Sequence, residues 1–162
     1  MSSIVIDSPV GFIEIKGTEE FITSVLFYDK PPTPSTDETP QLLFKAAAQL
    51  QEYFSGLRKE FDFPFEQTGT DFQQRVWAEL YKIPFGETIS YLDLAKRLGD
   101  VKSIRAAGTA NGKNKISIIV PCHRVIGTDG SLTGYAGGLF RKDWLLRHEG
   151  GWPNTNQISL FD

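Results

Sequence analysis

Cysteine, methionine and histidine are scarce in this chain of 162 residues, which has one cysteine, one methionine and two histidines. A single cysteine excludes an internal disulfide, and two histidines leave no obvious zinc site. No apolar run is long enough to span a membrane, and no charged stretch followed by an apolar segment suggests a secretion signal. We therefore expect a reduced thiol, a cytoplasmic location, no metal and no membrane attachment.

Charge is distributed unevenly along an otherwise ordinary composition of 40% hydrophobic and 23% charged residues. Residues 1–70 have 5 basic and 11 acidic side chains, a net charge of −6, whereas residues 71–162 have 12 and 9, a net charge of +3. Several basic residues of the second half fall in one stretch, which indicates either a modest nucleic-acid binding surface or an ordinary solvated face. Its members are Lys96, Arg97, Lys102, Arg105, Lys113, Lys115 and Arg124.

The single cysteine lies in Pro121-Cys122-His123-Arg124-Val125, directly after the apolar run 116–120. A lone cysteine is most often a small buried hydrophobe. Such a residue needs neither a proline to fix the backbone before it nor an imidazole beside it, whereas a nucleophile gains from both. The pattern therefore predicts a nucleophilic thiol.

The first 67 residues predict a small α/β unit, and the composition changes near residue 68. The alternating segment 61–65 predicts an edge strand, and the four prolines of 30–40 predict an extended loop. The remaining expected elements are strands over 4–6, 12–16 and 21–28 and a helix from Gln41 to about Lys59.

The second half predicts three helices, from Thr70 or Asp71 to Pro84, over 91–98 after a Ser90 cap, and from Ile104 to about Asn111. The last two are short and are joined by a turn containing glycine. This pattern is typical of a helix-turn-helix, although an ordinary corner between two helices has it too.

The last of these helices has an unusually small surface. Ala106, Ala107 and Gly108 let its backbone approach another surface closely, while Arg105 rises from that surface and Lys102 lies nearby. These features suit the minor groove of DNA better than base reading in the major groove. The alternative is close packing against another helix, with Arg105 solvated.

Three segments together resemble the O6-alkylguanine-DNA alkyltransferase family: Pro121–Val125, Gly130–Leu139 and Lys142–Glu149. The likeness runs from about residue 72 to 151, whereas the first half is similar only in size and in the order of its strands and helix. The resemblance implies an α/β (α+β) protein. Its expected parts are a ribonuclease-H-like α/β domain over 1–67, a winged-helix-like helix-turn-helix domain over 68–151 and a tail over 152–162.

The resemblance also implies roles for individual residues. Cys122 is the alkyl acceptor, His123 is the base that reaches it through a water, and Glu149 orients His123. Asn114 ties the cysteine turn to the helix-turn-helix. Tyr91 helps to rotate the nucleotide out of the duplex and donates toward guanine N3.

Further positions match DNA contacts and the pocket for the base. Arg105 matches the arginine that fills the space left in the duplex. The other expected DNA contacts are Tyr91, Lys102, Ala106, Ala107, Gly108 and Arg124. The expected pocket residues are Val125, Tyr135, Ala136 and Gly137. A serine is common at the position of Ala136, where a backbone N–H would still reach O6.

The implied activity is repair of double-stranded DNA by transfer of an alkyl group from O6 of guanine, and from O4 of thymine, to Cys122. Only a thiolate is nucleophilic enough to displace guanine from an alkyl carbon, and a Glu–His–water–Cys relay supplies the base that forms it. The attacked carbon belongs to a stacked base, so the nucleotide must rotate out of the duplex. The thioether product has no easy reverse path, so one protein molecule repairs one lesion. We expect the protein to be a monomer and to need no cofactor. A non-enzymatic alkylated-DNA binding protein, a cysteine hydrolase and a helix-turn-helix regulator remain as alternatives.

The segment Gln157-Ile158-Ser159-Leu160-Phe161 is similar to the pentapeptide with which bacterial repair proteins and polymerases hold the sliding clamp. Leu160 and Phe161 would fill an apolar pocket, and Gln157 would hydrogen-bond at its rim. Alternatively, Ile158, Leu160 and Phe161 fold back onto this protein's own surface.

Overall fold

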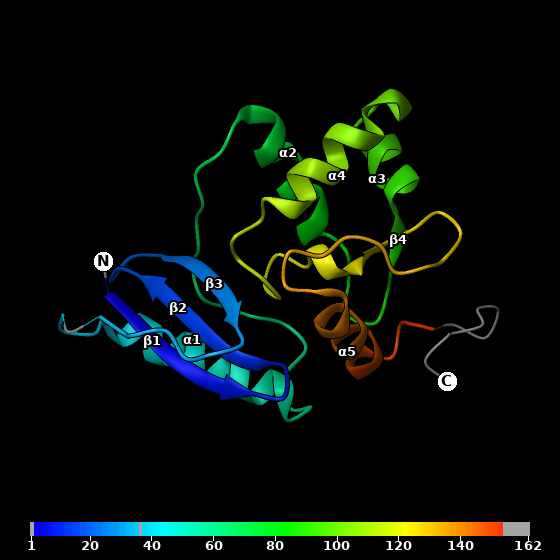
Figure 1. The fold of residues 1–162 in the computed structure, drawn as a ribbon. Coiled ribbons are helices and arrows are strands. Elements are labelled where there is room, and N and C mark those ends of the chain that lie inside the picture. The colour runs from blue at the N-terminus through cyan, green and yellow to red at the C-terminus, as the bar shows by residue number, and fades with distance from the viewer. Residues whose placement is uncertain (1, 36, 154–162) are drawn as a thin grey trace. The chain divides into compact units, whose positions relative to one another are not determined.

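The computed structural model describes residues 2–35 and 37–153 and divides the chain into two compact units (Figure 1). One unit comprises Met1–Thr68 and Lys115–Ile119, and the other comprises Gly69–Asn114 and Val120–Asp162. The division expected from the sequence placed residues 115–119 in the second half, whereas their contacts belong to the first unit. The expected clamp-binding segment 157–161 lies outside the described residues.

The first unit is an antiparallel sheet with a helix along one face (Figure 1). Its strands β1 (Ser2–Ser8), β2 (Gly11–Gly17) and β3 (Ile22–Tyr28) lie in the order β1-β2-β3. Helix α1 (Gln41–Phe54) contacts all three strands. Ile13 and Ile15 alternate along β2 and have no exposed surface, so they form part of the core beneath the sheet.

Two elements of this unit are shorter than the sequence predicted. The expected edge strand 61–65 is reduced to one parallel bridge between Phe65 and Ile22, because Pro64 has no N–H to donate to a ladder. Helix α1 ends at Phe54, because Gly56 takes a positive φ of 81°. The N–H groups of Gly56 and Leu57 then bond back to Tyr53 and Glu52, the Schellman pattern that closes a helix.

The second unit is mainly helical. Its helices are α2 (Asp71–Tyr81), α3 (Tyr91–Arg97), α4 (Ile104–Gly112) and α5 (Leu139–Glu149). Two short strands, β4 (Ile89–Ser90) and β5 (Val125–Ile126), pair in parallel. This pairing links the start of α3 to the segment that follows the cysteine.

Local capping explains where these helices begin. Thr70 and Gln73 form a capping box at the start of α2, and Ser90 and Asp93 form another at the start of α3. Gly99, with φ 90°, follows Leu98, the C-cap of α3. The predicted helix-turn-helix is therefore formed by α3 and α4, which pack against each other (Figure 1).

Two features are absent from the described part of the chain. No helix within residues 2–35 and 37–153 is both long enough and apolar enough to cross a lipid bilayer. The same residues contain no cluster of three or more histidine, cysteine, aspartate or glutamate side chains placed to hold a metal ion.

Candidate active site

A tight turn presents Cys122 at the start of the 3-10 turn η2 (Cys122–Arg124). Pro121 has φ −83° and ψ 65°, and the Cys122 N–H donates to the Val120 carbonyl at 2.8 Å. This is an inverse γ-turn. The Arg124 N–H then donates to the Pro121 carbonyl at 3.0 Å, so the backbone is held on both sides of the thiol.

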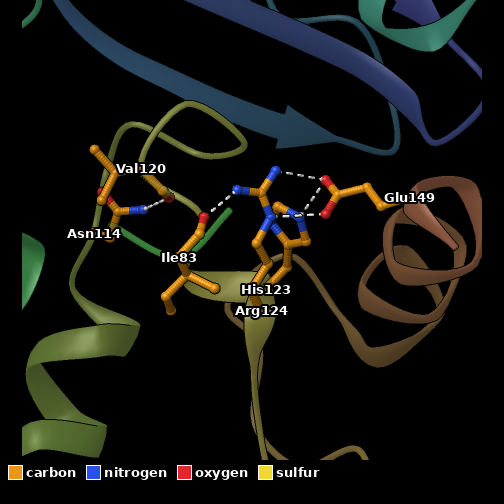
Figure 2. Close-up of polar contacts among 6 residues, drawn as sticks. All are labelled: Ile83, Asn114, Val120, His123, Arg124 and Glu149. Atoms are coloured by element: carbon orange, nitrogen blue, oxygen red, sulfur yellow. Dashed lines mark hydrogen bonds and ion pairs between the residues drawn. The ribbon is translucent and has the colours of Figure 1, made fainter. Parts of the chain in front are cut away.

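The Cys122 side chain is buried, and its sulfur contacts the amide of Asn114. Asn114 Nδ2 donates to the Val120 carbonyl at 2.8 Å, drawn in Figure 2, and contacts Cys122 Sγ at 3.3 Å. Burial raises the pKa of the Cys122 thiol, while the hydrogen bond from Asn114 and the charge of Lys142 act in the opposite direction. The resting thiol is therefore protonated and needs a base to become a nucleophile.

His123, Glu149 and Arg124 form a buried polar cluster (Figure 2). His123 Nε2 lies 2.8 Å from Glu149 Oε2, and Arg124 holds both carboxylate oxygens, with Nε 2.7 Å from Oε1 and Nη2 3.0 Å from Oε2. Burial alone would raise the pKa of Glu149, but the charges and hydrogen bonds of His123 and Arg124 hold it far below its usual range. Glu149 is therefore ionised in the folded protein.

The ionised carboxylate determines which nitrogen of His123 carries the proton. A carboxylate only accepts, so Nε2–H must donate to Glu149. Burial lowers the pKa of His123, with Glu149 opposing the shift, so the ring is neutral at rest. Nδ1 is then an acceptor, and it is buried with no hydrogen-bond partner among residues 2–35 and 37–153. His123, the residue after Cys122, thus has a ring nitrogen that can accept a proton and that no described residue occupies.

The position of Arg124 corrects its expected role as a DNA contact. Only 6% of the residue is exposed, and its third donor, Nη1, binds the Ile83 carbonyl at 2.6 Å (Figure 2). Three of its five N–H donors are thus bound to Glu149 and Ile83, and the residue is too buried for a surface contact with a phosphate. Arg124 is instead a positioning residue for Glu149.

Tyr91 and Lys142 meet at the loop that precedes α5. The Tyr91 hydroxyl donates to the carbonyls of Thr133 at 3.2 Å and Gly134 at 3.4 Å, and Lys142 Nζ donates to the same two at 2.9 and 3.2 Å. Burial lowers the pKa of Lys142 to about 8, with Cys122 opposing the shift. Burial also raises the pKa of Tyr91, as does the charge of Cys122, while hydrogen bonds to Thr133 and Asn111 lower it.

The expected base-pocket residues divide into a loop and a strand. Tyr135 and Gly137 are half-buried and Ala136 is exposed, all in the loop before α5. This loop is held by Arg141, whose Nη1 donates to the Gly137 carbonyl at 3.0 Å. Val125 in β5 has no exposed surface and belongs to the core.

Helix α4 presents part of the surface expected to contact DNA. Arg105, Ala106 and Lys102 are exposed, and Gly108 lies beside the Tyr91 ring, where an added Cβ would be 3.8 Å from the ring atoms. Ala107 corrects the expectation, because it is fully buried. Helical periodicity places it on the inward face with Ala110 and Asn111, and there it cannot contact DNA.

Two buried residues at the site, Lys142 and Asn111, were not predicted from the sequence. Lys142 has no exposed surface, and Asn111 Nδ2 lies 3.5 Å from the Cys122 carbonyl. The sequence contained a signal for each. Lys142 precedes Leu145, Leu146 and Glu149 at helical spacing, which is the inward face of α5. Asn111 likewise follows Ala107 by four residues on the inward face of α4.

Both halves of the chain match family models. Residues 1–67 match the model described as "6-O-methylguanine DNA methyltransferase, ribonuclease-like domain", and residues 71–151 match "6-O-methylguanine DNA methyltransferase, DNA binding domain".

Individual relatives match over most of their length. A methylated-DNA–protein-cysteine methyltransferase of Mycolicibacterium paratuberculosis is 45% identical over 160 residues, covering 97% of this chain and 96% of the relative. A constitutive one of Bacillus subtilis is 46% identical over 152 residues, covering 88% and 92%. The crystal structure of Mycobacterium tuberculosis OGT in complex with DNA is similar with a TM-score of 0.82 and 45% identity, covering 90% of this chain and 91% of that one.

Proposed function

This chain belongs to the 6-O-methylguanine DNA methyltransferase family, and on that premise we propose that Cys122 is the residue that accepts the alkyl group. The chain is a transferase that moves a methyl group from damaged DNA to a protein cysteine. The observation that carries the assignment is that Nδ1 of His123, the residue after the single thiol, is buried and has no hydrogen-bond partner among the described residues. No other cysteine is present to take the group.

The proposed chemistry begins with removal of the thiol proton. His123 Nδ1 takes it through a water, and Glu149 stabilises the resulting imidazolium through Nε2–H. Asn114 and the Lys142 ammonium stabilise the thiolate. The sulfur then attacks the alkyl carbon, so an S–C bond forms and the C–O6 bond breaks. The electron pair leaves with guanine, which is neutralised by a proton from Tyr91 at N3.

Recognition of the lesion is proposed to occur at α3 and α4. The alkylated base lies within the duplex stack, so its nucleotide must rotate out to meet a buried thiol. The exposed face of α4 carries the small Ala106 and the long Arg105, which suit close approach to the minor groove and filling of the vacated space. Lys102 would contact the phosphates.

The proposed substrates are O6-alkylguanine and, as a second base, O4-alkylthymine in double-stranded DNA. A thioether has no second thiol in this chain to resolve it, so each molecule reacts once. We propose that it acts as a monomer in the cytoplasm, where the thiol stays reduced.

Mass spectrometry of the intact protein after incubation with a methylated oligonucleotide tests this function. We expect a gain of one methyl group on Cys122, and no gain in Cys122→Ala, which should still bind the alkylated duplex. An unmodified protein that binds the duplex would instead be a non-enzymatic lesion-binding protein. Turnover without modification would indicate a hydrolase.

We further propose that the C-terminal segment Gln157–Phe161 docks the transferase on a bacterial sliding clamp. The support is its similarity to clamp-binding pentapeptides, with Leu160 and Phe161 as apolar anchors. Calorimetry of the full chain against the cognate clamp should give a dissociation constant on the order of 1–10 μM. Equal binding by the Leu160→Ala, Phe161→Ala double variant would contradict the proposal.

A further inference from the structure

Two adjacent cations of α5 hold the loop that leads into this helix (Figure 1). Lys142 binds the start of the loop, with Nζ 2.9 Å from the Thr133 carbonyl and 3.2 Å from that of Gly134. Arg141 binds its end, with Nη1 3.0 Å from the Gly137 carbonyl. The loop is therefore anchored to α5 on both sides of its central residues.

The segment between the two anchors contains a tight turn. The Gly138 N–H donates to the Tyr135 carbonyl at 2.9 Å. This bond closes a four-residue turn with Ala136 and Gly137 at its centre. The carbonyl that Arg141 binds belongs to the peptide between Gly137 and Gly138. Because a peptide unit is planar, a donor on this carbonyl fixes the orientation of the peptide and with it that of the turn.

The Arg141 guanidinium also contacts an aromatic ring. Only 6% of the residue is exposed, and its Cζ lies 4.7 Å from the centroid of the Phe140 ring. Phe140 itself is 62% exposed. An exposed ring over a buried cation attracts the cation and shields its hydrogen bond from water, which strengthens the contact with the loop.

The loop contacts residues of the proposed reaction. The Tyr91 hydroxyl donates to the same two carbonyls that Lys142 binds, so a base that meets Tyr91 enters beside the loop. The two anchors differ in their reach. The charge of Lys142 also lowers the pKa of the Cys122 thiol, whereas Arg141 acts on the turn.

We propose that Arg141 is a positioning residue that holds the turn Tyr135–Gly138 as a preformed wall of the base site and thereby determines how tightly the transferase binds the base. A preformed wall does not have to be ordered when the base arrives, so binding is not weakened by that loss of entropy. The inference rests on the proposed function, because it requires the base to enter beside Cys122 and Tyr91. It gives Arg141 no part in forming the thiolate or in breaking the C–O6 bond.

Saturation kinetics with a free base separate binding from chemistry. Arg141→Met keeps a long unbranched side chain and removes the charge and the donors. Reaction with O6-benzylguanine adds one benzyl group to Cys122, and mass spectrometry follows its rate over a range of base concentrations. We expect the half-saturating concentration to rise about tenfold, as for the loss of a hydrogen bond from a charged group. The limiting rate should change little.

Two comparisons separate this effect from a change at the thiol or in the fold. The rate at which iodoacetamide labels Cys122 should be the same in Arg141→Met and wild type, whereas Lys142→Met should slow it. Arg147→Met is the matched control, because it removes a guanidinium of the same helix that pairs with Asp143 at 3.0 Å. This control should leave the half-saturating concentration unchanged.

Phe140→Ala provides a second test at an exposed position, where the fold should tolerate the change. Loss of the ring should raise the half-saturating concentration about two- to fivefold, and it should add nothing when Arg141 is already methionine. If Arg141→Met does not fold, Phe140→Ala decides the question. An unchanged half-saturating concentration in the deciding variant overturns the assignment. Equal falls in the limiting rate and in the iodoacetamide rate overturn it too.

The experiment also distinguishes this inference from the function on which it rests. A wild-type protein that takes an alkyl group neither from the free base nor from methylated duplex would refute the proposed function. If wild type reacts with the duplex alone, the same comparison is made with methylated duplex. An active wild-type protein whose half-saturating concentration is unchanged in Arg141→Met would refute only the role of Arg141.

Discussion

Arg124 and Glu149 form a two-point ion pair in which the guanidinium holds both carboxylate oxygens at 2.7 and 3.0 Å (Figure 2). The two side chains are only 7% and 1% exposed. The pair leaves Glu149 ionised and fixed in position, and Glu149 in turn sets the tautomer of His123. Arg124, which follows His123 in the chain, therefore acts on the His123 ring through a carboxylate 25 positions away in the sequence.

Arg124→Ala should lower the free energy of unfolding by about 3–5 kcal/mol, because it leaves a buried carboxylate without its cation. Urea unfolding measures this loss. Lys82→Ala is the matched control, since it breaks an exposed ion pair with Glu79 and should cost less than about 1 kcal/mol. A similar small loss in both variants would show that the Arg124 pair contributes little.

Asn114→Ala should slow alkylation of Cys122 by iodoacetamide and shift its pH dependence upward. The variant loses the hydrogen bond that opposes the effect of burial on the thiol pKa. Because the chain has one cysteine, the labelled site is unambiguous. Methyl transfer should fall by about tenfold or more. An unchanged pH profile would mean that the contact with Sγ has no electrostatic effect.

Lys142 makes the stability of the protein depend on pH in the alkaline range. Burial lowers its pKa from 10.5 to about 8, so between these values the unfolded chain binds more protons than the folded chain. Stability due to Lys142 therefore rises with pH across this window, by at most about 1.4 kcal/mol per pH unit. Wild type should gain stability relative to Lys142→Met between pH 8 and 10. Parallel curves would contradict the prediction.

Arg105→Ala should lose far more activity on methylated duplex than on free O6-benzylguanine, because a free base leaves no space in a duplex to fill. Arg105 is exposed on α4, so its removal should leave the fold intact. The rates with the two substrates, measured on the same preparation, decide the question. Equal losses would place Arg105 in the chemistry or in the core.

Local features of the second unit were predicted well because their causes lie within a few residues. Thr70 and Ser90 begin helices through capping boxes formed with residues three positions ahead, and Gly99 follows the last turn of α3 with a positive φ. These capping residues can be predicted from the sequence, because the capping side chain and its backbone partner lie only three residues apart in the chain.

The extent of elements in the first unit was predicted less well. Periodicity continued the first helix to about Lys59, but a positive φ at Gly56 closed it at Phe54. The alternating apolar residues of 61–65 predicted a strand where only a single bridge forms. The alternation of apolar residues indicates which face of a segment is buried. Strand pairing also needs backbone N–H donors, and a proline has none.

Residue identity and short spacing were enough to predict a nucleophilic thiol between a proline and a histidine, and a helix-turn-helix. The folded structure was needed to show which charged and polar groups are buried. It placed Arg124 on Glu149 instead of on a surface, enclosed Lys142 against two carbonyls and turned Asn111 toward Cys122. The burial of a polar group depends on partners far along the chain, and the local sequence around such a residue fits an exposed position equally well.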